Sequence, residues 1–85
     1  MSPETVRARR LDLSVRQIEV LDYIEYYIDM YEVSPTVREI AEGVDSSSPG
    51  PVHWVLSVLR DKGYITWLPH KARTIRVLKP AVGRR

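Results

Sequence analysis

The chain has 85 residues and a net charge of +2, enough for one domain with a small core. It has no cysteine, which excludes disulfides, thiolate metal sites, iron–sulfur clusters and cysteine nucleophiles. No apolar run approaches the ~18 residues of a membrane-spanning helix and no signal peptide is recognisable, so we expect a cytoplasmic protein with no membrane partner. Residues 14–45 carry eight acidic against two basic side chains, whereas residues 46–85 carry eight basic against one acidic. Such a division can give a nearly neutral protein a face that binds polyanions.

Three segments are distinguishable along the chain. Residues 1–12 have no apolar period and contain three arginines, and we interpret them as a mobile basic arm. Residues 13–79 carry regular apolar patterns and are expected to form the folded domain. Residues 80–85 form a basic tail.

The first helix is predicted from Ser14 to about Tyr31. Ser14 and Gln17 form a capping box, and Leu13 with Ile18 brackets it as a hydrophobic staple. Apolar residues then recur at mostly three- and four-residue spacing, which predicts one inward stripe. Its members are Ile18, Leu21, Ile24, Ile28 and Tyr31.

A second, two-turn helix is predicted to begin at another capping box, formed by Thr36 and Glu39. Gly43 indicates where this helix stops. The residues expected to face inward are Ile40, Ala41 and Val44.

The third helix follows a connector, residues 45–51, that is rich in turn and capping residues. Ser48 is a natural N-cap ahead of Pro49, but Pro51 disfavours helical angles at the residue before it, so the helix begins at either proline. It runs to about residue 62, and Gly63 ends it. Its inward stripe is Val52, Val55, Leu56 and Leu59.

After Gly63 the pattern changes from helix to strand. Residues 64–68 and 74–78 are rich in β-branched and aromatic side chains, which predicts a hairpin with a loop at 69–73. Trp67 is expected to pack on the core or within the hairpin. Three helices and a hairpin give a mainly α fold with a small β-hairpin, the layout of a winged helix-turn-helix. In that motif the later helix lies in the major groove of DNA and the earlier one crosses the backbone.

The outward side of the third helix and the hairpin supply the candidate contacts to double-stranded DNA. The base-reading candidates are Ser48, Gly50, Pro51, His53, Trp54 and Ser57. The backbone candidates are Thr36, Arg60, His70, Lys71, Arg73 and Arg76. Two of these candidates have an alternative interpretation. Instead of contacting DNA, Trp54 would pack on the arm or on a second protein copy, and His70 would be a solvated loop residue.

Five sequence motifs together resemble one known family. They are Leu13-Ser14-x-Arg16-Gln17-x-Glu19-Val20-Leu21, Pro35-Thr36-x-x-Glu39-Ile40-Ala41, Ser48-Pro49, Leu56-x-x-Leu59-x-x-Lys62-Gly63-x-Ile65 and Arg73-x-Ile75-Arg76-Val77. This set is similar to the DNA-binding domain of LexA, the repressor of the bacterial SOS response, over residues 13–79. The resemblance implies a sequence-specific transcription regulator of repressor type that reads its operator mainly with the start of the third helix.

The chain departs from the family pattern in two respects. The family typically has an asparagine where Gly50 stands, a small residue at Pro51, and polar or acidic residues at His53 and Trp54, which implies a different operator. LexA also has a C-terminal domain that cuts its own linker and supplies the dimer interface, and this chain ends before it. We therefore expect no self-cleavage, weak or DNA-induced homodimerisation, and either a stand-alone regulator or a fragment.

A protein-interaction module is the alternative hypothesis, since fold does not fix function. Pro51, Trp54 and Val58 would then form an apolar patch for a protein partner, which also accounts for the missing polar reading residues. An enzyme is not expected, because the two histidines lack a third ligand or nucleophile partner and no phosphate loop or metal spacing is present. No cofactor or metal is expected either.

Overall fold

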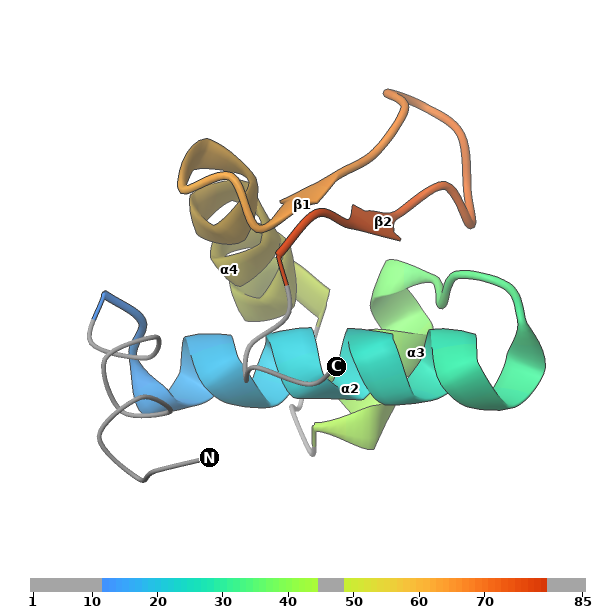
Figure 1. The fold of residues 1–85 in the computed structure, drawn as a ribbon, viewed down its shortest axis with the longest axis horizontal. Coiled ribbons are helices and arrows are strands. Elements are labelled where there is room, and N and C mark those ends of the chain that lie inside the picture. The colour runs from blue at the N-terminus through green and yellow to red at the C-terminus, as the bar shows by residue number, and fades with distance from the viewer. Residues whose placement is uncertain (1–11, 45–48, 80–85) are drawn as a thin grey trace.

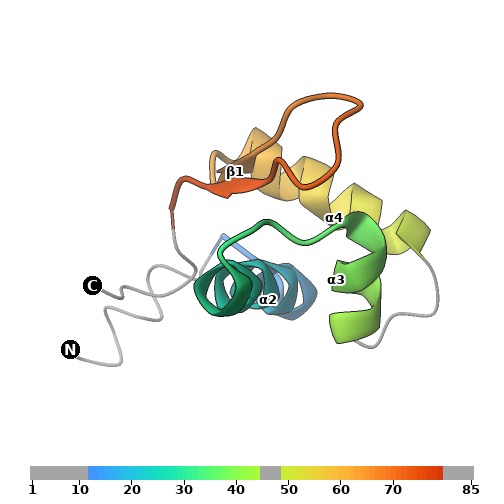
Figure 2. The same ribbon diagram turned by 90° about the vertical axis from the view of Figure 1, so that its right-hand side faces the viewer.

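The computed structural model describes residues 12–44 and 49–79. The elements in chain order are α2 (Val15–Tyr31), α3 (Val37–Gly43), α4 (Pro49–Asp61), β1 (Ile65–Thr66) and β2 (Arg76–Val77). The helices α2 and α3 lie side by side, and α4 and the hairpin are stacked across them (Figures 1 and 2). None of the helices in the described ranges is long and apolar enough to cross a membrane. The predicted winged helix-turn-helix is confirmed, and residues 65–77 are its wing.

Both predicted capping boxes are present. At the start of α2, the Gln17 amide donates to Ser14 Oγ at 3.1 Å and the Ser14 amide donates to Gln17 Oε1 at 2.9 Å. At the start of α3, the Glu39 amide donates to Thr36 Oγ1 at 3.1 Å and the Thr36 amide donates to Glu39 Oε1 at 2.9 Å. Each box satisfies backbone donors that a helix start otherwise leaves without partners.

The third helix, α4, begins at Pro49, the earlier of the two predicted starts. After its end, Gly63 adopts a φ of 84°, the left-handed conformation that glycine reaches without strain. Its predicted inward stripe is buried, and Leu59 has no exposed surface. The helix therefore places its remaining faces toward solvent.

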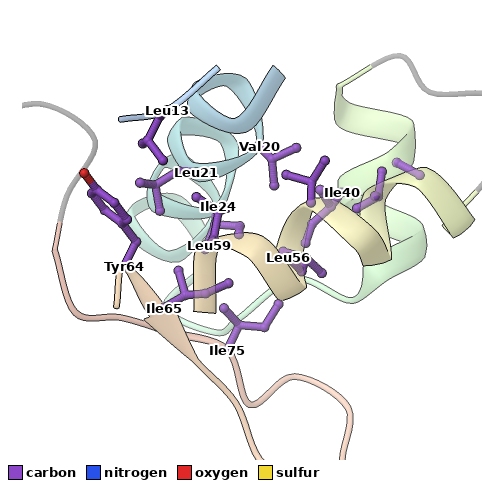
Figure 3. Packing of buried hydrophobic residues seen from close by; sticks show 13 residues of the cluster. Leu13, Val20, Leu21, Ile24, Ile40, Leu56, Leu59, Tyr64, Ile65 and Ile75 are labelled. Atoms are coloured by element: carbon purple, nitrogen blue, oxygen red, sulfur yellow. The ribbon is translucent and has the colours of Figure 1, made fainter. Parts of the chain in front are cut away.

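One apolar core joins the three helices to the hairpin (Figure 3). From α2 it receives Val20, Leu21 and Ile24, of which Val20 was not in the predicted stripe. The prediction that Tyr31 faces inward is wrong: Tyr31 is exposed, and its ring lies 4.5 Å from that of Tyr27. Because α2 is longer than the elements packed on it, its last turn extends beyond the core.

Gly43 is the last residue of α3, as the sequence predicted. The need for glycine at this position comes from close packing and not from turn geometry. A Cβ added there would lie 2.2 Å from the ring of Tyr23 on α2. Only a residue without a side chain lets the end of α3 approach that ring.

The two strands are shorter than predicted. Only Ile65 with Val77 and Thr66 with Arg76 pair in the antiparallel ladder. Beyond Thr66 the Leu68 amide donates to Thr74 Oγ1 at 3.0 Å instead of to the opposite strand, which ends the ladder. The wing loop, residues 67–75, is therefore held by side chains more than by strand pairing.

Candidate nucleic-acid interface

The buried stripe of α4 determines which of its side chains reach solvent. The helix packs on both α2 and α3 through Val52, Val55, Leu56 and Leu59. Trp54 projects from another face with 65% of its surface exposed. Among the described residues it is the most exposed aromatic side chain.

Most of the base-reading candidates lie on the exposed side of α4. The candidates in its first two turns that the structure describes are all exposed: Gly50, Pro51, His53 and Trp54. Among the described residues, no atom lies within 4 Å of a Cβ added to Gly50, so none of them crowds this position. Ser57 is half-buried, and its hydroxyl donates to the His53 carbonyl at 3.2 Å. Ser48 lies outside the described residues.

Trp67 joins the wing to α4. The rings of Trp67 and His53 meet edge to face with centroids 6.3 Å apart. The guanidinium carbon of Arg60 lies 4.3 Å from the centroid of the Trp67 ring, a cation–π contact. Trp67 is half-buried and packs on the core, in agreement with the packing role expected for it. His53 and Arg60 therefore lie on the flank of α4 that faces the wing.

A hollow of about 290 Å³ lies where α3, α4 and the wing meet. The candidate residues among those that line it are Thr36, His53, His70, Lys71 and Arg73. They come from the N-cap of α3, from α4 and from the wing loop, which are far apart in the sequence. The fold thus gathers polar and cationic side chains beside the exposed face of α4, an arrangement suited to a polyanionic backbone.

Arg76 does not line this hollow. It lines a larger hollow of about 900 Å³ between the wing and the second half of α2, together with Glu25, Asp29 and Glu32. None of the described residues that line this hollow comes from α4. Arg76 thus lies on the side of the wing that faces α2, and its contact with a DNA backbone stays a prediction.

Arg73 is bound to other parts of the protein. Its Nη1 donates to Glu39 Oε1 at 3.0 Å and its Nη2 donates to Oε2 at 2.9 Å, a bidentate ion pair. Nη1 also donates to the Ser34 carbonyl at 3.2 Å and to the Tyr27 hydroxyl at 3.5 Å. Hydrogen bonds from Arg73 and from the Thr36 backbone lower the pKa of Glu39 to about 2. A DNA contact by Arg73 therefore stays a prediction, and a DNA phosphate would compete with Glu39 for the guanidinium.

Sequence reasoning missed this pairing and the part of Ser34 in it. Arg73 and Glu39 are separated by 34 positions, and Glu39 already had a local role in the capping box of α3. Nothing in the spacing of either residue points to the other. The helix-turn-helix core, the exposed α4 and the wing with its basic loop together define a domain of the winged helix-turn-helix class.

Comparison with known proteins specifies the family. The family model described as the LexA DNA binding domain matches residues 10–74. The LexA repressor of Halalkalibacterium halodurans is 48% identical over 66 residues, that of Staphylococcus aureus (strain N315) is 42% identical over 67, and the transcription regulator LexA of Synechocystis is 38% identical over 66. The chain belongs to the LexA DNA-binding domain family. These matches cover 78–79% of this chain and 32% of each relative, so the chain spans about a third of their length.

Proposed function

We propose that this chain binds specific sequences of double-stranded DNA and acts as the DNA-binding part of a transcriptional repressor. Family membership supports the proposal, and the relatives it matches carry the name LexA repressor. The observation that carries it is the exposed face of α4 beside a hollow that collects cationic and polar candidates from three elements. In this arrangement α4 lies in the major groove and the wing loop lies along the phosphates.

Each group of side chains has a distinct proposed role. His53 and Ser57 hydrogen-bond to base edges, and Trp54 packs on a thymine methyl group or a sugar. Gly50 and Pro51 let the helix approach the groove closely. The backbone contacts come from Thr36, Arg60, His70, Lys71 and Arg76, which fix the register of the protein without reading sequence.

We propose that two copies act together on DNA. A single module of this size makes few phosphate contacts, so it should bind weakly at physiological salt, and its affinity falls as salt rises. Two copies on half-sites about one to one and a half helical turns apart would supply the missing affinity and specificity. Sedimentation should therefore find a monomer without DNA and a dimer on a palindromic duplex. A tight dimer in the absence of DNA would contradict this.

Selection of bound duplexes from a randomised pool, at near-physiological salt, tests DNA reading. We expect an enriched palindrome of two half-sites. Trp54→Ala and His53→Ala should each lose discrimination at particular base positions by about 1–3 kcal/mol, the usual value of a specific base contact. Tyr26→Ala, which removes another exposed aromatic side chain from α2, is the matched control and should select the same sequence.

Retention on heparin distinguishes DNA binding from the protein-interaction alternative. Lys71→Glu reverses one charge in the exposed wing loop, so it should elute at lower salt if this surface binds a polyanion. Unchanged retention, together with no enriched sequence in the selection, would favour a protein partner for the exposed Trp54.

A further inference from the structure

Two residues on the returning side of the wing, Arg73 and Ile75, bind Ser34 in the segment between α2 and α3. The Ile75 amide donates to Ser34 Oγ at 3.1 Å, and Arg73 reaches the Ser34 carbonyl and the Glu39 carboxylate. Ser34 itself is buried. We call these contacts of Arg73 and Ile75 with Ser34 and Glu39 the wing anchor.

The outgoing side of the wing is held differently. Trp67 lies against His53 and Arg60 of α4, whereas the wing anchor holds the other side on α3 and on the segment before it. At the base of the wing, on the other side of these attachments from the loop, the ladder contains two residue pairs. A ladder this short does little to fix the direction of the loop it carries. The attachments on either side of the loop therefore set where His70 and Lys71 lie relative to α4.

We infer that Arg73 is a positioning residue, which fixes the basic wing loop beside α4 through Glu39 and Ser34 instead of contacting a DNA phosphate itself. This inference rests on the proposed function, because a positioned loop matters only if the loop binds DNA. It assigns the phosphate contacts of this region to neighbouring side chains such as Lys71.

The geometry around Arg73 supports this assignment. Both terminal nitrogens of its guanidinium already donate to protein acceptors, so only Nε and the second Nη2 hydrogen remain for a phosphate as long as the pair with the Glu39 carboxylate holds. That carboxylate also accepts from the Thr36 amide in the capping box, which holds it in place. Arg73 has a backbone φ of 59°, a conformation that residues other than glycine adopt uncommonly. Such backbone persists where the surrounding contacts determine it.

Conservative substitutions separate a positioning role from a phosphate contact. Arg73→Lys keeps the positive charge, which serves a phosphate as well, but loses the planar fork that engages Glu39 and Ser34 together. Glu39→Gln keeps the capping box, because glutamine also serves at this position, and removes the negative charge of the ion pair. The matched controls are Arg16→Lys and Glu19→Gln, since Arg16 likewise pairs with a glutamate, at 3.4 Å, and donates to the Val44 carbonyl, at 2.8 Å.

The measurement is affinity for the selected duplex across a range of salt, at a temperature where circular dichroism shows every variant folded. Arg73→Lys and Glu39→Gln should each weaken binding about tenfold, the equivalent of one lost charge-assisted contact, and the double variant should be no weaker than either. The two controls should bind as the wild type does. If Arg73→Lys binds like the wild type, or Glu39→Gln binds more tightly, Arg73 is a phosphate contact and the inference is wrong.

Amide hydrogen exchange at Ile75, measured without DNA, tests the wing anchor independently. Arg73→Lys should accelerate exchange at Ile75 while leaving the core amides of α4 unchanged, whereas a merely stabilising role would move both together. Unchanged exchange at Ile75 would overturn the inference even if the protein binds DNA. A wild-type protein that prefers no duplex would instead refute the proposed function, and faster exchange in Arg73→Lys would then still establish the anchor.

Discussion

The helical part of the molecule and the wing are held together by different kinds of interaction. The helices α2, α3 and α4 share one apolar core, and α2 and α3 each begin with a capping box. The wing contributes Ile65 and Ile75 to that core, but its loop is held by the hydroxyl of Thr74, the ring of Trp67 and the wing anchor.

This difference separates what stabilises the protein from what orients its candidate interface. Loss of a core side chain should lower the stability of the whole domain, because the three helices share that one core. Loss of a wing contact leaves the core packed, so it should act mainly on the position of the basic loop and only weakly on global stability. We therefore expect the effects of substitution to fall in two classes, global in the helices and local in the wing.

The largest effect on stability is expected at Leu59. This side chain has no exposed surface and lies at the centre of the core (Figure 3), so Leu59→Ala should lower the free energy of unfolding by about 2–5 kcal/mol. A domain of this size has roughly 5 kcal/mol in total, so the variant should keep at most about 3 kcal/mol. Trp54→Ala on the same helix removes a larger but exposed side chain and should change stability by less than about 0.5 kcal/mol. Urea denaturation measures both, and equal losses would contradict the orientation of α4.

A smaller effect on stability is expected at Gly43, and its sign should depend on whether Tyr23 is present. Gly43→Ala places a methyl group 2.2 Å from the ring of Tyr23, and displacing that ring should cost about 1–3 kcal/mol. In a Tyr23→Ala background the obstacle is gone. There the same substitution should stabilise the protein by up to about 1 kcal/mol, because alanine is the better helix former. A destabilisation of equal size in both backgrounds would show that Gly43 is required for another reason.

The elements governed by local patterns were predictable from the sequence. Capping boxes join residues three apart, and the buried stripe of α4 follows directly from helical spacing, so both were found where expected. Gly43 was placed correctly at the end of α3 but for the wrong reason, since its contact with Tyr23 depends on how two helices cross. The prediction for Tyr31 failed because periodicity does not show where the partner elements end.

The arrangement of the candidate site was less predictable. Composition and motif position identified the exposed residues of α4, and the basic wing loop followed from its density of cationic side chains. Sequence alone did not show that Arg73 would pair with Glu39 or that Arg76 would lie on the α2 side of the wing. Both facts depend on the direction of a loop that is set by contacts between distant residues.

The hydroxyl of Ser34 provides a test of the local class. Ser34→Ala removes the acceptor of the buried Ile75 amide and should cost about 1 kcal/mol of global stability, less than the full penalty for an unsatisfied donor because the wing can lift to admit water. Exchange at the Ile75 amide should accelerate more than exchange in α4. Ser57→Ala, which removes a hydroxyl that donates to the His53 carbonyl within α4 at 3.2 Å, is the matched control and should leave Ile75 unaffected. Equal acceleration throughout the domain would place the wing in the same cooperative unit as the helices.

The smallest effect is expected from the ion pair of the wing anchor, and it should depend on pH. The pKa of Glu39 is lowered to about 2 in the folded protein, against about 4.3 for an unperturbed glutamate. Because the folded-state pKa is depressed, the pair stabilises the fold fully above about pH 4.3, and the contribution is lost as the pH falls toward 2. The difference in Tm between the wild type and Glu39→Gln should therefore be constant from pH 5 to 7 and shrink below pH 4. The same subtraction with Glu42→Gln controls for the removal of a carboxylate from α3. A difference that stays constant down to pH 2 would mean that Arg73 holds the wing through Ser34 and Tyr27 without help from the charge of Glu39.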